Sequence, residues 1–160
     1  MAVDYFLKID GVPGESADAK HKGEIQLESF SWGASQTGTM AYGGGGGAGK
    51  VDMQDFHCVK QVDKASPVLF NHCATGEHLK KALLTMRKAG KEQQEFMKWT
   101  FNDLLVTSYT LSGSNGAGEA MEQISMNFTK ISVDYAAQKA DGTLEGYTTK
   151  GYDIKANKAF

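Results

Sequence analysis

Apolar and polar residues alternate with period two along most of the chain, and this pattern restricts the fold more than any other feature. Residues 3–9 place four apolar side chains on one face of an expected strand, and residues 121–135 contain the clearest alternation. Several such segments joined by short turns predict antiparallel sheets that form a barrel or a sandwich. The other expected strands cover residues 25–32, 51–62, 77–88, 96–101, 104–111 and 147–154.

The expected strand at residues 25–32 changes its apolar face partway along. Ile25 and Leu27 lie on one face, whereas Phe30 and Trp32 lie on the other. A change of this kind predicts either a bulge or the crossing of the strand from one sheet to another.

One helix is expected after these strands. Ser66 is a suitable N-cap, Pro67 fits the first helical position, and Gly76 is placed to end the helix. Residues 77–88 have helix propensity as well as alternation, and we predict a strand because Gly76 interrupts the helix. The predicted fold is therefore mainly β: one domain over residues 1–160, an antiparallel β-barrel of two sheets flanked by one α-helix, with a long glycine-rich loop.

Composition and the N-terminal sequence exclude several classes of function. Lys and Arg number 17 against 19 Asp and Glu, and Arg87 is the only arginine, so nucleic-acid binding is not expected. No stretch approaches the roughly 20 apolar residues that span a bilayer, and the N-terminus does not read as a signal peptide. We expect synthesis in the cytoplasm, no membrane anchor, and any export by a route that does not read an N-terminal signal.

Two patterns are reminiscent of ligand sites, but neither fits its chemistry. Residues 44–50 satisfy most of a phosphate-binding loop, yet Val51 stands where the motif needs Ser or Thr, and a strand follows. The His-Cys dipeptides at 57–58 and 72–73 lack the ligand spacing of zinc sites, and neighbours in a strand point to opposite faces. We therefore expect no metal, no cofactor, and two reduced, mostly buried cysteines.

A series of short motifs over essentially the whole chain resembles one bacterial family. In chain order the motifs are residues 1–10, 14–16, 29–33, 43–50, 55–56, 63–67, 74–76, 87–90, 126–128 and 151–153. Each motif is weakly specific by itself, but their order and spacing together are specific. The chain resembles the haemolysin-coregulated protein (Hcp) family, the tube subunits of bacterial type VI secretion systems.

The resemblance implies a β-barrel flanked by one helix, with six copies in a ring around a pore and rings stacked into a hollow tube. It implies several partners: the chain itself as a homohexamer, the valine-glycine repeat spike protein (VgrG), contractile sheath and baseplate proteins, and effector cargo carried or chaperoned in the pore. It also implies secretion to the extracellular space or a target cell without a signal peptide, and a structural role rather than an enzymatic one.

Two sets of residues are expected to serve such a tube. Because Phe30 and Trp32 are expected to enter the core, Ser29 and Ser31 face the other way and are candidates for the pore lining, with plain outer surface as the alternative. Residues 37–50, on which the family's extended loop falls, are candidates for ring stacking, since a long loop can become ordered on assembly. The stacking candidates are Thr39, Met40, Tyr42, Gly43, Gly44, Gly45, Gly46, Gly47, Gly49 and Lys50.

Two other classes of function stay open on the residues alone. A small ligand-binding β-barrel module unrelated to secretion would be a monomer with a ligand-lined cleft. An enzyme that used the glycine loop for a nucleotide would be stabilised by ATP. No serine, cysteine or histidine stands at a spacing that marks a nucleophile with its base, so no enzymatic activity is expected.

Overall fold

Antiparallel strands form most of the molecule, as the alternation predicts. The computed structural model describes residues 2–38, 48–90, 92–116 and 118–160. The mainly β class is confirmed, and the described residues contain one helix. The elements are β1 (Val3–Ile9), β2 (Ile25–Leu27), β3 (Ser29–Ser31), β4 (Ala34–Gly38), β5 (Ala48–Met53), β6 (Phe56–Gln61), α1 (Ser66–Thr75), β7 (Leu79–Lys88), β8 (Gln94–Ser112), β9 (Met121–Tyr135), β10 (Thr148–Asp153) and β11 (Lys158–Ala159).

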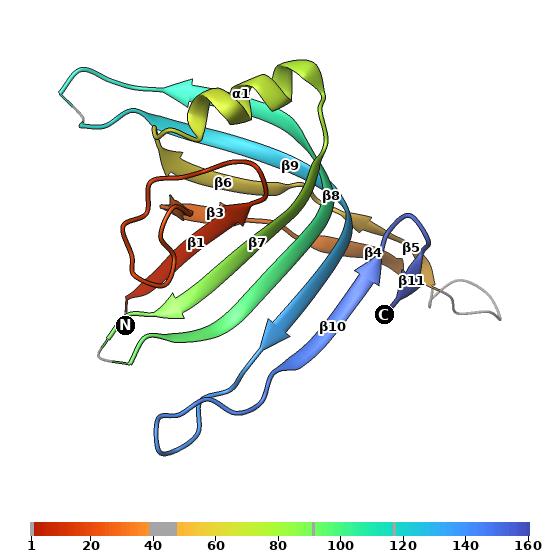
Figure 1. Ribbon diagram of the computed structural model, residues 1–160. Helices are drawn as coiled ribbons and strands as arrows, with labels where there is room; N and C mark the ends of the chain where they lie inside the picture. Colours follow the sequence, from red (N-terminus) through yellow and green to blue (C-terminus); the bar gives the residue numbers. More distant parts are fainter. Residues whose placement is uncertain (1, 39–47, 91, 117) are drawn as a thin grey trace.

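Nine of the described strands belong to one sheet that curves around the core (Figure 1). Its order is β11-β10-β9-β8-β7-β1-β2, with β6 beside β9 and β3 beside β6. The first half of β9 pairs with β6 and its second half pairs with β10. The sheet is therefore curved like a barrel, but the hydrogen-bonded pairing of the described strands does not run all the way around it.

The change of apolar face at residues 25–32 is a crossing rather than a bulge. The strand β2 pairs with β1, whereas β3, one residue later, pairs with β6. Between them the Glu28 N–H donates to the Val59 carbonyl oxygen at 2.8 Å. One chain segment thus joins the two ends of the curved sheet.

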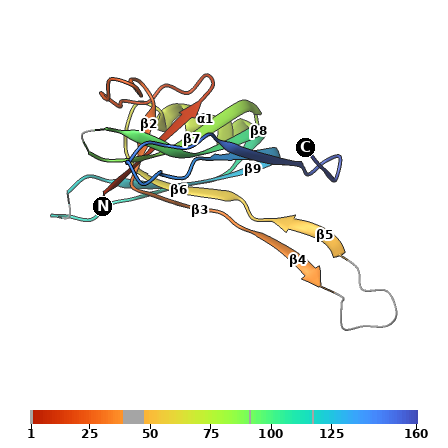
Figure 2. The ribbon, with the colours of Figure 1, turned by 90° about the horizontal axis from the view of Figure 1, so that it is seen from below.

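The strands β4 and β5 form a separate hairpin that extends away from the body (Figure 2). Ala34 pairs with Met53 at its base, and the Gln54 N–H donates to the Gly33 carbonyl oxygen at 2.8 Å. The single strand predicted over residues 51–62 is therefore wrong: it is divided into β5 and β6. The strand β4 was not expected from the sequence.

The strand β8 is one 19-residue element, although the sequence predicts two strands, at 96–101 and 104–111. Asp103 lies between the two and has a φ of 52°, in the left-handed region that non-glycine residues rarely adopt. Pairing continues on both sides of it, so the interruption is local.

The helix α1 ends as predicted but begins differently. Gly76 has a φ of 72°, and its N–H donates to the His72 carbonyl oxygen, which completes the C-terminal cap. The N-cap is Ala65, not Ser66. The Ser66 hydroxyl instead donates to the carboxylate of Glu122, on β9, at 2.5 Å.

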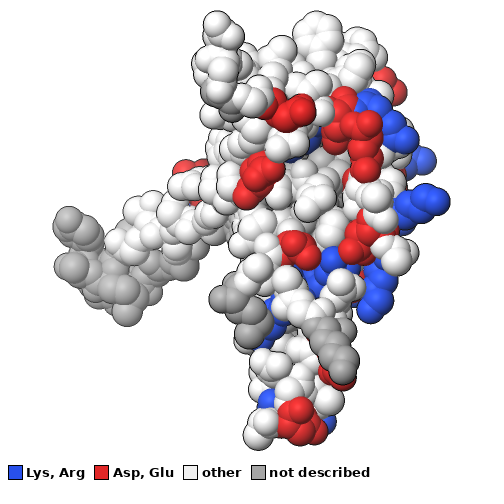
Figure 3. All heavy atoms as spheres, turned by 90° about the vertical axis from the view of Figure 1, so that its left-hand side faces the viewer, with Lys and Arg blue, Asp and Glu red and all other residues white. Residues whose placement is uncertain are grey.

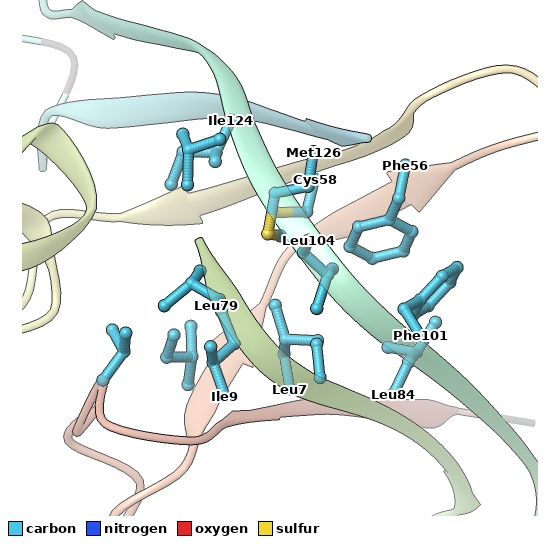
Figure 4. Close-up of a cluster of buried hydrophobic side chains, with 14 of the residues drawn as sticks. Leu7, Ile9, Phe56, Cys58, Leu79, Leu84, Phe101, Leu104, Ile124 and Met126 are labelled. Carbon is cyan, nitrogen blue, oxygen red and sulfur yellow. The ribbon is translucent and has the colours of Figure 1, made fainter. Parts of the chain in front are cut away.

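The core is filled by apolar side chains from the inner sides of the strands (Figure 4). Phe56 and Phe101 lie with ring centroids 4.8 Å apart at its centre. Cys58 lies among them, and burial raises the pKa of its thiol to about 12, so this cysteine is not a reactive nucleophile.

A buried ion pair lies beside the start of the helix. The Lys60 ammonium contacts the Glu122 carboxylate at 2.6 Å and the Asp63 carboxylate at 2.7 Å, and Glu122 is 0% exposed. Burial by itself would raise the pKa of Glu122, but hydrogen bonds from Lys60, Ser66 and Tyr109 outweigh it and hold the pKa below its ordinary value. This cluster connects β6 and β9 to the helix.

Candidate functional site

The outward positions of β3, β6, the first half of β9 and the last part of β8 form a continuous surface, here named the polar face. These positions alternate with core residues, so their side chains point away from the core. No outward position described on these strands carries Lys, Arg, Asp or Glu. The polar face consists of Ser29, Ser31, His57, Val59, Gln61, Ser108, Thr110, Ser112, Met121, Gln123, Ser125 and Asn127.

Strand pairing arranges the centre of the polar face as a row of hydroxyls with one imidazole. Ser31 lies opposite His57, His57 lies opposite Ser125, and Ser125 lies opposite Ser108. Directly opposite residues on neighbouring strands have side chains in reach of one another. Four strands therefore present one line of short hydrogen-bonding side chains.

The imidazole in this row is hydrogen-bonded to a hydroxyl. Ser125 Oγ and His57 Nδ1 lie 2.5 Å apart, and Ser125 is only 8% exposed whereas His57 is exposed. No hydrogen bond joins His57 Nε2 to a described residue. The pair thus lacks the carboxylate that orients the base in a catalytic triad.

A carboxylate lies at the border of the polar face, just before β6. Asp55 accepts hydrogen bonds from the Thr107 hydroxyl at 2.8 Å and from the Asn127 amide at 2.9 Å. Thr107 occupies the irregular position in the pairing of β8 with β9, and such bulges re-aim side chains. Both Asp55 oxygens are therefore engaged within the chain.

The predicted pore residues lie where the alternation places them. Ser29 and Ser31 are exposed on β3, and Phe30 and Trp32 pack against the core. The Trp32 ring meets the Trp99 ring edge-on, with centroids 4.8 Å apart. The inward position of the two aromatics is thus confirmed, whereas a pore role for the serines stays a prediction.

Most of the predicted stacking loop lies outside the described residues. Gly49 and Lys50 belong to β5, and Val51 follows in the same strand, so the predicted strand after the glycine run is confirmed. Lys50 is exposed. The remaining candidates, Thr39, Met40, Tyr42 and residues 43–47, lie outside the described residues.

The outward positions of β1 and β7 differ from the polar face because residues 10–24 cover them. Arg87 on β7 donates to both carboxylate oxygens of Asp18, at 2.9 and 2.6 Å, and to Asp4 at 3.2 Å. The buried His21 ring stacks on Phe6 at 4.4 Å. We name this region the covered face.

In Figure 3 acidic and basic side chains gather toward one side of the molecule, and few lie on the side from which the hairpin extends.

His21 also connects the covered face to β8. Its two ring nitrogens contact Glu24 at 2.8 Å and Glu95 at 2.7 Å. Burial raises the pKa of Glu95, but the hydrogen bonds from Lys98 and His21 outweigh it, so the pKa lies below its ordinary value. These contacts fix the loop onto the sheet.

The described residues include neither a cluster of metal ligands nor a helix that could span a membrane. They contain no group of three or more His, Cys, Asp and Glu that could hold a metal ion. His57 is exposed and Cys58 buried, on opposite faces of β6 as predicted. In the described ranges no helix has both the length and the apolar character needed to span a bilayer.

Sequence reasoning missed His57, Ser125 and Asp55 as members of one surface. The alternation of Phe56 and Cys58 with their neighbours was the available signal that His57 points outward. No local pattern, however, indicates that β6 pairs with β9, so the row itself was not predictable.

Comparisons with known proteins agree with this geometry. The family described as "Type VI secretion system effector, Hcp" matches residues 6–135. "Protein hcp1" of Pseudomonas aeruginosa is 46% identical over 159 residues, which cover 98% of each chain. Hcp1 of Salmonella typhimurium is 42% identical with a TM-score of 0.83 and full coverage of both chains. A solved "type six secretion system protein" is 30% identical with a TM-score of 0.94, covering 99% of this chain and 100% of its own.

Proposed function

The chain belongs to the Hcp family of type VI secretion systems and is a subunit of the secretion tube, and from this premise we propose that six copies form a ring and that the rings stack into a hollow tube. The observation that carries the proposal is the match of fold and sequence over the whole chain. The alternative, a ligand-binding β-barrel module unrelated to secretion, has no comparable support.

The curved sheet suits a ring of identical subunits. A closed ring needs two different surfaces on each copy that fit one another. The strands β11 and β3 are each paired on one side only, and these edge strands offer unlike surfaces to the neighbouring copies.

We place the polar face, with Ser29 and Ser31, on the lumen of the ring. Its hydroxyls and amides offer hydrogen bonds, and its strands present no fixed charge, so polar cargo can be held without being trapped. Ring stacking is assigned to residues 39–50, supported by the hairpin β4–β5, whose described part already extends from the body (Figure 2).

The proposed partners follow from the tube. They are VgrG at the tip, sheath and baseplate proteins around the tube, and effectors in the lumen. The family is a secreted, structural one. We propose for this chain that it has no catalytic activity, and that it is made in the cytoplasm and delivered to the extracellular space or a target cell without a signal peptide.

Size-exclusion chromatography with light scattering and electron microscopy of the purified protein test the assembly. We expect particles of about six copies with a central hole. A monomer at every concentration would favour the ligand-binding module instead.

Ser31→Gln tests the lumen assignment, because a longer side chain on the polar face should obstruct cargo. The variant should form rings but lower the cellular level of an effector produced with it. Ser114→Gln, in the exposed turn between β8 and β9, is the matched control and should change neither property.

A further inference from the structure

His57 is the one histidine of the polar face, and none of the other outward side chains described there is acidic or basic. It is exposed, and the other outward positions of the four strands carry hydroxyl, amide or apolar side chains. Histidine is the residue type that ordinarily titrates between pH 5 and 8. The net charge of this surface therefore depends on a single position in each copy.

No described carboxylate forms an ion pair or a hydrogen bond with His57, whose one described side-chain partner is Ser125. Neither β3 nor β9 places a titratable side chain on the outward positions opposite it, where Ser31 and Ser125 lie. Asp55 is the nearest carboxylate along the strand, and both of its oxygens accept hydrogen bonds from Thr107 and Asn127.

Charged groups on the inner side of the same strands do not reach the polar face. Lys60 and Glu122 are buried there and paired with each other at 2.6 Å. Tyr109, inward on β8, donates to the same Glu122 carboxylate. The charge on His57 thus faces whatever occupies the space outside the polar face.

Protonation also changes which hydrogen bonds the ring offers. A neutral imidazole has one donor and one acceptor nitrogen, whereas the cation has two donors. With Nδ1 engaged by Ser125, the protonated ring keeps its Nε2–H for another acceptor, and Ser31 lies opposite His57 on the neighbouring strand. This combination of a charged donor and a hydroxyl matches a carboxylate.

We propose that His57 makes cargo binding in the lumen depend on pH, with cargo surfaces that carry carboxylates among hydroxyl groups bound more tightly when the imidazole is protonated. This proposal rests on the placement of the polar face on the lumen. In a ring of six, the histidines act together on one cargo, so individually weak contacts add up.

Fluorescence anisotropy on assembled rings tests the proposal. The probe is a short labelled peptide of alternating Ser and Asp, and its matched control has Asn in place of Asp. We expect the affinity for the Asp peptide to be roughly tenfold higher at pH 5 than at pH 8, with no such change for the Asn peptide. His57→Gln should remove the pH dependence, and His57→Lys should give tight binding at both pH values.

Two results would overturn the proposal: a pH response that survives in His57→Gln, or equal binding of the Asp peptide at both pH values. Thermal unfolding and electron microscopy verify that each variant folds and forms rings. The variant Ser31→Gln distinguishes failure of the His57 proposal from failure of the lumen assignment. If Ser31→Gln weakens peptide binding while His57→Gln keeps the pH response, only the role of His57 is wrong. If Ser31→Gln changes no binding at all, the lumen assignment is wrong as well.

Discussion

The covered face and the polar face lie on the outer side of the same curved sheet, yet their polar groups have different tasks. On the covered face, Arg87 and His21 are buried and hydrogen-bonded to carboxylates of the loop and of β8. On the polar face, Ser31 and His57 are exposed. The covering loop thus engages the outward polar residues of the covered face in contacts within the fold. Elsewhere they are available for contacts with other molecules.

The largest expected effect concerns the inner side of the polar-face strands. Lys60→Met should lower the free energy of unfolding by about 3–5 kcal/mol, because Glu122 would remain buried without its partner. Denaturant unfolding measures the change. The double variant Lys60→Met, Glu122→Met should recover much of the loss, since two apolar side chains replace the whole pair. If Lys60→Met left the free energy of unfolding unchanged, these strands would need no charged residue on their inner side, just as they have none on the polar face.

The next effect concerns the covered face. Arg87→Met should lower the Tm by about 2–4 °C and speed tryptic cleavage after Lys20 and Lys22, because the loop loses its contacts with β7. Lys80→Met, at an exposed position of the same strand, is the control and should change neither measurement. Unchanged cleavage in Arg87→Met would mean that other contacts hold the loop.

Low pH should also reduce the stability of the protein, because protonation of Asp18 removes its ion pair with Arg87. The hydrogen bond from Arg87 holds the pKa of Asp18 well below its ordinary value of 3.8. Because the pKa of Asp18 is lower in the folded protein than in the unfolded chain, the ion pair with Arg87 stabilises the fold fully at pH values above 3.8. This contribution is lost as the pH falls toward the pKa of the folded protein. Unfolding measured from pH 6 down to pH 2 should therefore show stability falling below about pH 4, and Arg87→Met should show a smaller fall. An equal fall in both proteins would contradict the assignment.

The smallest effect is expected on the polar face. Ser29→Ala and Gln123→Ala should change the free energy of unfolding by no more than about 0.5 kcal/mol, because both side chains are exposed and are not needed for packing. Thermal and denaturant unfolding measure this. A loss of about 2 kcal/mol or more in either variant would remove the contrast between the two faces.

Local patterns predicted much of the fold. Strand alternation gave β1, β7 and β9, and Gly76 marked the end of the helix. The errors arose where a distant partner decided the local structure. Ser66 is the first residue of the helix and not its N-cap, and its hydroxyl bonds to Glu122, 56 positions away.

The candidate site divides in the same way. The sequence by itself determined which side chains point inward and which outward, because that direction alternates along every strand and needs no partner. Only the tertiary structure decided which outward residues become neighbours. His57 and Ser125 are 68 positions apart, and Arg87 and Asp18 are 69 apart. Strand pairing and loop docking bring them together, and both depend on contacts across the whole molecule that no local stretch of sequence encodes.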